Sequence, residues 1–331
     1  MKREISYIYS LRIFAILSVI MLHCITPYVF NPLYFGTKSY YFNLITNSVV
    51  RTGVPIFLMI SGVLILGDDL TGNVKAFYKK RIPKLLIPLL SWNVIYYFFS
   101  LYMTNGTFSF KALVDGILGN GNGYHLWYLY TLIALYLLAP FIKNVVDNRS
   151  VSEIMVFMFL LGFCTTFRPL INNTISPYYV YLFDPLGNGY SLFFVAGYLI
   201  DRLKFTKIQK TVLLLLGVLG LCISAFGNHN ASSENAISFI HNGGFDISAF
   251  LFAIGVFSLF RMTVKSAGTF TKTLSGISYA MYFIHVAIIE IILKHFMINA
   301  SPLVSELYIF VITVLASVLF AYVIRKIKIL N

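Results

Sequence analysis

Apolar residues occur along this chain in long runs that short polar or charged segments interrupt. A helix needs roughly 20 mostly apolar residues to cross a bilayer, and runs such as 211–220 lack the alternation of a membrane β-barrel strand. The pattern therefore predicts an all-α, polytopic membrane helix bundle of about ten spans: Ile8–Tyr28, Leu44–Leu66, Leu85–Met103, His125–Ile142, Ile154–Phe167, Tyr190–Ile200, Val212–Phe226, Phe245–Phe260, Ile277–Leu293 and Leu303–Ile324.

Three of the predicted spans are short. They are the fifth, sixth and seventh, and the sixth could begin near Tyr178 with a break at Asp184–Gly189. The first run exceeds the roughly 7–15 apolar residues of a signal peptide and lacks a small-x-small cleavage site. We expect it to be a membrane span that is retained.

Composition excludes the soluble classes of protein. Of 331 residues, 58% are hydrophobic and 11% are charged, against about 25% charged in a soluble domain, and the mean hydropathy is +0.80. A cytosolic enzyme, a secreted domain and a disordered chain all need more charge on their surface. Three cysteines are too few for a disulfide scaffold.

The net charge of +13 is best interpreted from where the cations lie along the chain. With ten spans and a cytoplasmic amino terminus, 19 of the 25 cations fall inside and four fall outside, namely Lys38, Lys111, Arg168 and Lys294. This bias fits the positive-inside rule, predicts that both termini are cytoplasmic, and favours contact with anionic lipid headgroups. No nucleic-acid partner is needed to explain it.

Two ionisable residues in the first span lie on one helix face. Arg12 and His23 are 11 residues apart, which corresponds to three turns and about 16 Å along the axis. Charged groups in the hydrocarbon zone are costly and usually functional. The alternative is that Arg12 anchors the topology and His23 is an interfacial ring.

The second span carries Arg51 about seven residues from its outer end, followed by Pro55 and by Gly62 on the same face. Pro55 predicts a bent helix whose freed backbone groups line a cavity. Arg51 could instead extend outward to the interface.

Two further segments have the composition of binding sites. Four cations at the start of the third span include Lys80, Arg81 and Lys84; they could clamp phosphates arriving from the cytoplasm or simply follow the positive-inside rule. The fourth span begins with the segment that contains His125, Trp127 and Tyr128. Its aromatic rings could stack on a sugar, or they could belong to the interfacial aromatic belt.

The ninth span contains Ser278, Tyr282 and His285, with Ser278 and His285 seven residues apart on one face. His285 near the bilayer centre is either functional or a satisfied core histidine. Glu290 is the one carboxylate that we expect well inside a span. Ion-coupled transporters usually place carboxylates in the core, so this scarcity disfavours ion-coupled transport. No Cys/His cluster has zinc spacing, so we expect no metal.

Taken in order, these motifs resemble the acyltransferase-3 family of integral membrane acyltransferases. The resemblance rests on the Arg12–His23 pair, the segment from Arg51 to Gly62, the basic start of the third span, the His125-Leu-Trp-Tyr element and the Ser278–His285 phrase. It is greatest to stand-alone O-acetyltransferases of bacterial surface polysaccharides, of the enterobacterial-common-antigen type. One departure is Lys84, where the family often has a second arginine.

The resemblance implies that residues 1–331 form one integral membrane acyltransferase domain in the bacterial cytoplasmic membrane. It implies transfer of an acetyl group from cytoplasmic acetyl-CoA to a hydroxyl of a lipid-linked or surface glycan. A thioester donor is already activated, so a base suffices. We assign His23 as that base, Arg51 or His285 to substrate orientation or oxyanion stabilisation, and the coenzyme A phosphates to Arg12, Lys80, Arg81 and Lys84.

Two other functions fit the same composition. A lipid-linked glycan flippase or secondary transporter could bind a pyrophosphate headgroup with the same basic face, and a scaffold for a polysaccharide synthase would need no chemistry. The acceptor sugar, the size of the acyl group and a homodimer all stay open at this point.

Overall fold

The computed structural model describes residues 5–119, 121–162, 189–239 and 246–324. These residues form a helix bundle, in which we find no β-strand within the described ranges. The α-helices are α1 Ser6–Val29, α2 Lys38–Val50, α3 Gly53–Leu66, α4 Val74–Arg81, α5 Pro83–Thr104, α6 Phe110–Leu118, α7 Trp127–Asn148, α8 Val151–Gly162, α10 Tyr190–Arg202, α11 Lys207–Asn230, α12 Ile247–Thr263, α13 Thr269–His295 and α14 Pro302–Ile324; the short 3-10 helices are η1 Pro32–Tyr34 and η2 Asp69–Gly72.

The chain is a multi-pass membrane protein by the length and composition of its helices. Seven helical segments of the described chain are long and apolar enough to span a bilayer, and two shorter apolar helices, Val151–Leu160 and Ile247–Thr263, accompany them. This confirms the all-α membrane bundle; the number ten and the orientation of the termini stay predictions. The end of the fifth predicted span, the proposed break before Gly189, and Phe245 lie outside the described residues.

Proline divides the second predicted span into two helices. α2 ends at Val50 and α3 begins at Gly53. Pro55 has no backbone N–H to donate to the Arg51 carbonyl, so a continuous helix would lack that hydrogen bond. The predicted bend is therefore confirmed, and the interruption lies at Arg51 and Thr52. A second interruption at Ile82 separates α4 from α5, whose first residue is Pro83.

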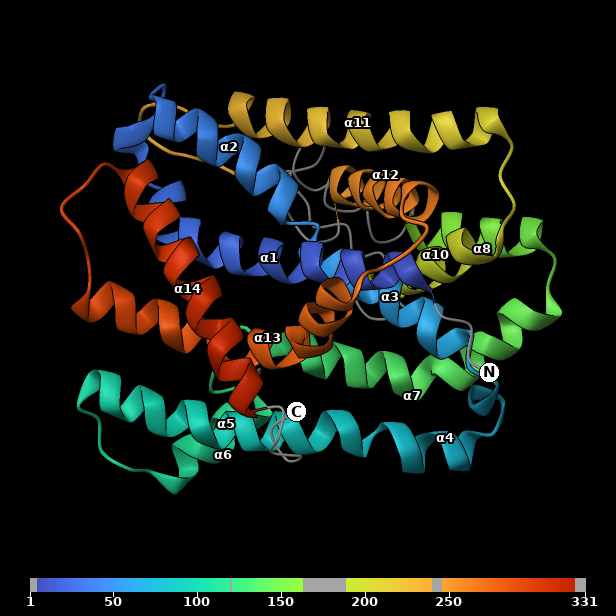
Figure 1. Cartoon of the computed structure of the whole chain (residues 1–331), viewed down its shortest axis with the longest axis horizontal. Helices are drawn as coiled ribbons and strands as arrows, with labels where there is room; N and C mark the ends of the chain where they lie inside the picture. Colours follow the sequence, from blue (N-terminus) through green and yellow to red (C-terminus); the bar gives the residue numbers. More distant parts are fainter. Residues whose placement is uncertain (1–4, 120, 163–188, 240–245, 325–331) are drawn as a thin grey trace, which may run out of the picture.

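α1 lies at the centre of the bundle and packs against α2, α3, α12, α13 and α14. In Figure 1 it runs through the middle of the molecule, with α11 on one side and α5 on the other. The helices on the outside expose apolar side chains, as Phe98, Leu215 and Leu315 do. Such surfaces suit contact with lipid acyl chains.

Glycines allow α3 and α10 to approach closely. A Cβ atom on Gly62 would lie 1.8 Å from the carbonyl oxygen of Phe194, and one on Gly197 would lie 2.2 Å from that of Met59. Small residues at helix crossings let backbones pack tightly in membranes, where van der Waals contact replaces the hydrophobic effect as the driving force. This crossing fixes α3 against α10, and both helices contribute residues to the cavity described next.

Candidate active site

A cavity of about 1090 Å³ opens at the end of the bundle where α1 begins, which we call the amino-terminal end. Its lining comes from α1, α3, the end of α4, α7 and α10 and includes eight charged residues. The cations are Arg12, Arg81, Lys143 and Arg202, and the carboxylates are Asp68, Asp69, Asp147 and Asp201. The volume slightly exceeds the usual range of about 300–1,000 Å³ for small-molecule sites.

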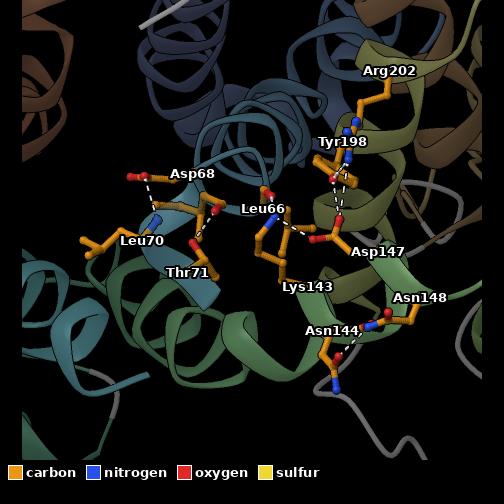
Figure 2. A network of polar contacts seen from close by, with 11 residues as sticks. Leu66, Asp68, Leu70, Thr71, Lys143, Asn144, Asp147, Asn148, Tyr198 and Arg202 are labelled. Carbon is orange, nitrogen blue, oxygen red and sulfur yellow. Dashed lines mark hydrogen bonds and ion pairs between the residues drawn. The ribbon is translucent and has the colours of Figure 1, made fainter. Parts of the chain in front are cut away.

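Most of these charges are paired across the cavity wall. Arg81 forms an ion pair with Asp68. Lys143 Nζ lies 2.8 Å from Asp147 and donates to the Leu66 carbonyl at 2.9 Å. Figure 2 shows Asp147 between Lys143, Tyr198 and Arg202, and the Tyr198 hydroxyl donates to it at 3.1 Å. Hydrogen bonds and ion pairs therefore fix the cavity wall near residue 147.

The four residues that we predicted to bind coenzyme A phosphates lie in two environments. Arg12 and Arg81 line the cavity. Lys80 and Lys84 are exposed and do not belong to its lining. The sequence analysis did not anticipate Asp68, which lies 13 residues before its partner Arg81 and neutralises it.

Three histidines from separate segments, two helices and the turn before α7, meet deeper in the bundle. The ring centroids of His23 and His285 are 5.2 Å apart, and those of His125 and His285 are 5.3 Å apart. His285 and His125 are buried, whereas His23 is partly exposed. The ring of His23 thus packs against the imidazole of His285 and the ring of Tyr124. His23 is not among the residues that line the cavity at the amino-terminal end.

The hydrogen bond of His285 determines which of its nitrogens can act as a base. Its Nδ1 lies 2.7 Å from the Tyr282 carbonyl oxygen. A carbonyl can only accept, so Nδ1 carries a proton and donates, which leaves Nε2 unprotonated in the neutral ring. That Nε2 is buried and has no hydrogen-bond partner within the described residues, and the same holds for both nitrogens of His125. Unpaired buried polar atoms of this kind mark functional sites or bound water.

Arg51 lies at the α2–α3 interruption, within electrostatic range of His23. Its Nε donates to Asn47 Oδ1 at 3.3 Å, and Asn47 is fully buried. Asn47 is a functional candidate that the sequence analysis missed. Its position four residues before Arg51, one turn away on the same face, was the available signal.

Tyrosines and a serine occupy the region between the cavity and the histidines. Arg12 interacts electrostatically with Tyr136 and Tyr128. Both phenols lie within hydrogen-bonding reach of the Ser61 hydroxyl. The ring of Tyr128 contacts that of Tyr282, with centroids 5.7 Å apart. A series of polar side chains therefore connects Arg12 to the histidine cluster.

The three predicted sugar-binding residues separate in space. His125 belongs to the histidine cluster, and its carbonyl accepts a hydrogen bond from Tyr282. Tyr128 is buried beside Tyr282, and Trp127 packs against Tyr190 with ring centroids 5.4 Å apart.

Tyr124 is the exposed aromatic residue that contacts the cluster. Its side chain is 54% exposed, and its ring centroid lies 5.1 Å from that of His23. Partial burial, together with the nearby Glu290 carboxylate, raises the pKa of the Tyr124 phenol. The hydroxyl is therefore protonated at neutral pH and can donate a hydrogen bond.

One fully buried carboxylate was not anticipated from the sequence. Glu290 is only partly buried, whereas Glu306 in the first turns of α14 is fully buried. Asn43 Nδ2 donates to Glu306 Oε1 at 2.8 Å. Helix packing encloses Glu306 although it lies in the first turns of α14.

Comparison with known proteins defines the class. The family of acyltransferase-3 domains matches residues 5–326, so the chain belongs to this family and is an acyltransferase. The resemblance inferred from the motifs is thereby confirmed at the level of the family.

Two curated relatives carry other names. A serine/alanine racemase of Enterococcus gallinarum is 29% identical over 67% of this chain, and an amino-acid racemase of Enterococcus faecalis is 28% identical over 49% of it. The matched segments cover 33% and 23% of those two proteins, so the chain corresponds to a minor part of their length. No solved structure matches the chain.

Proposed function

We propose that the protein transfers an acetyl group from cytoplasmic acetyl-CoA to a hydroxyl of a lipid-linked or surface glycan, in the cytoplasmic membrane of a bacterium. The observation that carries this proposal is the contact between His23 and His285, beyond a cavity that Arg12 and Arg81 line. An acyltransferase needs a base at the acceptor hydroxyl and a separate site for its donor. The histidines would supply the base, and the cavity with Arg12 and Arg81 would supply the donor site, at different depths in the bundle.

The donor would enter from the amino-terminal end. Arg12 and Arg81 would hold coenzyme A phosphates, and Lys80 and Lys84 would attract them at the exposed surface beside Arg81. Arg12 and His23 are 11 residues apart on α1, or about 16 Å. The flexible pantetheine arm would extend past Tyr136 and Tyr128 and carry the thioester toward His23.

The transfer step needs no metal and no serine nucleophile. A neutral His23 would accept the proton of the acceptor hydroxyl while its oxygen attacks the thioester carbonyl. The new C–O bond forms, the C–S bond breaks, and the coenzyme A thiolate receives the proton. Arg51 would stabilise the oxyanion of the tetrahedral intermediate.

His285 would act on His23 through its unprotonated Nε2. Because Nδ1 is bound to the Tyr282 carbonyl, Nε2 can accept a proton from a neighbouring imidazole but cannot donate one to an oxyanion. We therefore assign His285 to orienting His23 or sharing its proton. The acceptor would approach past Tyr124 and Trp127, whose rings suit stacking on a sugar.

Transfer by the purified protein tests this proposal. Labelled acetyl-CoA and candidate glycans are supplied to the wild type, to His23→Ala and to His295→Ala, which changes an exposed histidine at the end of α13. Loss of a general base lowers turnover by roughly 100-fold or more. We expect that loss for His23→Ala and wild-type turnover for His295→Ala. Equal transfer by His23→Ala would remove this residue from the mechanism.

A further inference from the structure

A second cavity, of about 450 Å³, lies beside the first at the amino-terminal end. The two share Ile5 and Asp201 in their linings. The second is formed by the start of α1, the connection between α10 and α11, and the end of α12 with the residues that follow. It contains none of the residues assigned above to the donor or to the histidine cluster.

The charge of this second cavity differs from that of the first. Four cations line it, namely Lys204, Lys210, Arg261 and Lys265, and Asp201 is the one carboxylate in its lining. The cavity therefore has an excess of three positive charges, whereas the first has four cations and four carboxylates. A bound anion here would not have to displace a cation from an existing ion pair.

The floor of the second cavity is fixed by hydrogen bonds. Asp201 accepts from the Tyr7 hydroxyl at 2.7 Å. Arg261 Nη2 donates to the carbonyls of Asp201 and Leu203 at 2.8 and 2.7 Å, and its guanidinium lies 5.5 Å from the centre of the Phe205 ring. Since a guanidinium has five N–H donors, these two bonds hold Arg261 in place and leave further donors for a ligand.

The three lysines around Arg261 are free to bind. Lys204, Lys210 and Lys265 are exposed, and among the described residues none of them forms an ion pair. Apolar side chains complete the wall, and they are Leu203, Phe205, Met262 and Val264. The cavity thus combines converging cations with an apolar surface.

We propose that the second cavity binds a phosphate group carried on an apolar or aromatic body. Lysines and a fixed arginine favour phosphate oxygens, and Phe205 and Met262 would pack against the rest of the ligand. Two ligands have this chemistry: an anionic phospholipid of the surrounding membrane, and the adenosine 3′-phosphate end of an acyl-CoA whose diphosphate would lie at Arg12 and Arg81 in the adjoining first cavity. The second source rests on the proposed function, whereas the first does not.

Binding measurements on two matched variants test the site. One variant is Lys204→Gln/Lys210→Gln/Lys265→Gln, and the control is Lys75→Gln/Lys79→Gln/Lys207→Gln, which removes the same charge from exposed lysines outside the lining. The probes are adenosine 3′,5′-bisphosphate, followed by calorimetry in detergent, and phosphatidylglycerol against phosphatidylcholine, followed by native mass spectrometry. Neither probe carries an acyl thioester, so the result is independent of turnover.

We expect the cavity variant to bind one of the two probes about tenfold more weakly or worse, because each lost charge-assisted hydrogen bond weakens binding to that degree. The affinity of the control should stay within about twofold of the wild type, which is much less than the effect of losing one such hydrogen bond. Weaker binding of the bisphosphate identifies the donor nucleotide as the ligand, and weaker binding of phosphatidylglycerol identifies lipid. If the wild type binds neither probe, or if the two variants bind equally, the proposal is overturned.

Discussion

His285 presents an unprotonated Nε2 to its neighbours because its Nδ1–H is committed to the Tyr282 carbonyl. At the level of single residues, this hydrogen bond gives the three histidines different roles. His23, partly exposed and in contact with Tyr124, is placed to meet a substrate. His125 and His285 are buried behind it and can only act through it or hold it in position.

Asn47 positions Arg51, and its removal provides a test. Asn47→Ala deletes the oxygen that accepts from Arg51 Nε, so the guanidinium loses its orientation toward His23. A hydrogen bond to a charged group contributes about 1.5–3 kcal/mol, and we expect kcat to fall roughly tenfold or more with the donor KM unchanged.

Steady-state kinetics of this series separates positioning from general destabilisation. Asn47→Asp keeps the accepting oxygen and should recover most of the lost turnover, while Thr46→Ala, which changes the adjacent half-buried side chain, should match the wild type. A loss of turnover in Asn47→Asp as large as that in Asn47→Ala would argue against the positioning role.

The ion pair between Arg81 and Asp68 gives a second prediction. Arg81 binds Asp68 through Nη2 and keeps other N–H donors, but the carboxylate neutralises its charge and so weakens its attraction to a donor phosphate. Asp68→Asn should therefore lower the KM for acetyl-CoA, and Arg81→Ala should raise it several-fold, each with a smaller effect on the glycan KM. Arg149→Ala, which changes an exposed cation paired with Glu153, serves as the control. A donor KM that is the same in all three variants would contradict the assignment of Arg81.

Some of these residues could be found from the sequence and others could not. Arg12, His23 and His285 stand out because an ionisable group within an apolar run is costly. The pairing of the cavity charges could not be found, because Asp68 reaches Arg81 and Asp147 reaches Arg202 from other segments of the chain. The contact of His125 with His285 likewise joins distant segments. Fold, family and candidate residues were therefore accessible from the sequence, whereas the pairing of charges required the structure.

At the level of helices, the α3–α10 crossing depends on two glycines. Gly62→Ala would place a methyl group 1.8 Å from the Phe194 carbonyl oxygen, which is backbone and cannot rotate away. Overpacking costs about 1–3 kcal/mol, so thermal unfolding in detergent should shift to a lower temperature.

Gly276→Ala is the matched control for this crossing, because nothing lies within 4 Å of the added Cβ on α13. Alanine is favoured over glycine within a helix by about 1 kcal/mol, and the unfolding temperature should stay the same or rise. Equal destabilisation by the two substitutions would show that the crossing is not specially tight.

Helix interruptions were predictable to different degrees. Pro55 indicated the bend in the second span, and α2 and α3 do separate just before it. The separation of α4 from α5 at Ile82 was not expected, although Pro83 signals it by the same physical argument. The close approach of α3 and α10 could not be foreseen, since which helices cross at a glycine is decided by tertiary packing.

At the level of the whole molecule, the charged cavities and the histidines lie at different depths. Both cavities open at the amino-terminal end and include Ile5 in their linings. Arg12 lies at the first cavity and His23 lies three turns further along the central helix α1. This separation favours a donor and an acceptor that arrive from opposite sides, as transfer across a membrane requires.

Sided transfer in reconstituted vesicles tests this account most directly. Protein is inserted in one orientation, which protease cleavage of an amino-terminal tag verifies, and labelled acetyl-CoA is supplied to one face at a time with glycan on the other. We predict that label reaches the glycan only when the donor meets the face that carries the amino terminus. Equal labelling from either face, or labelling only from the opposite face, would contradict the account.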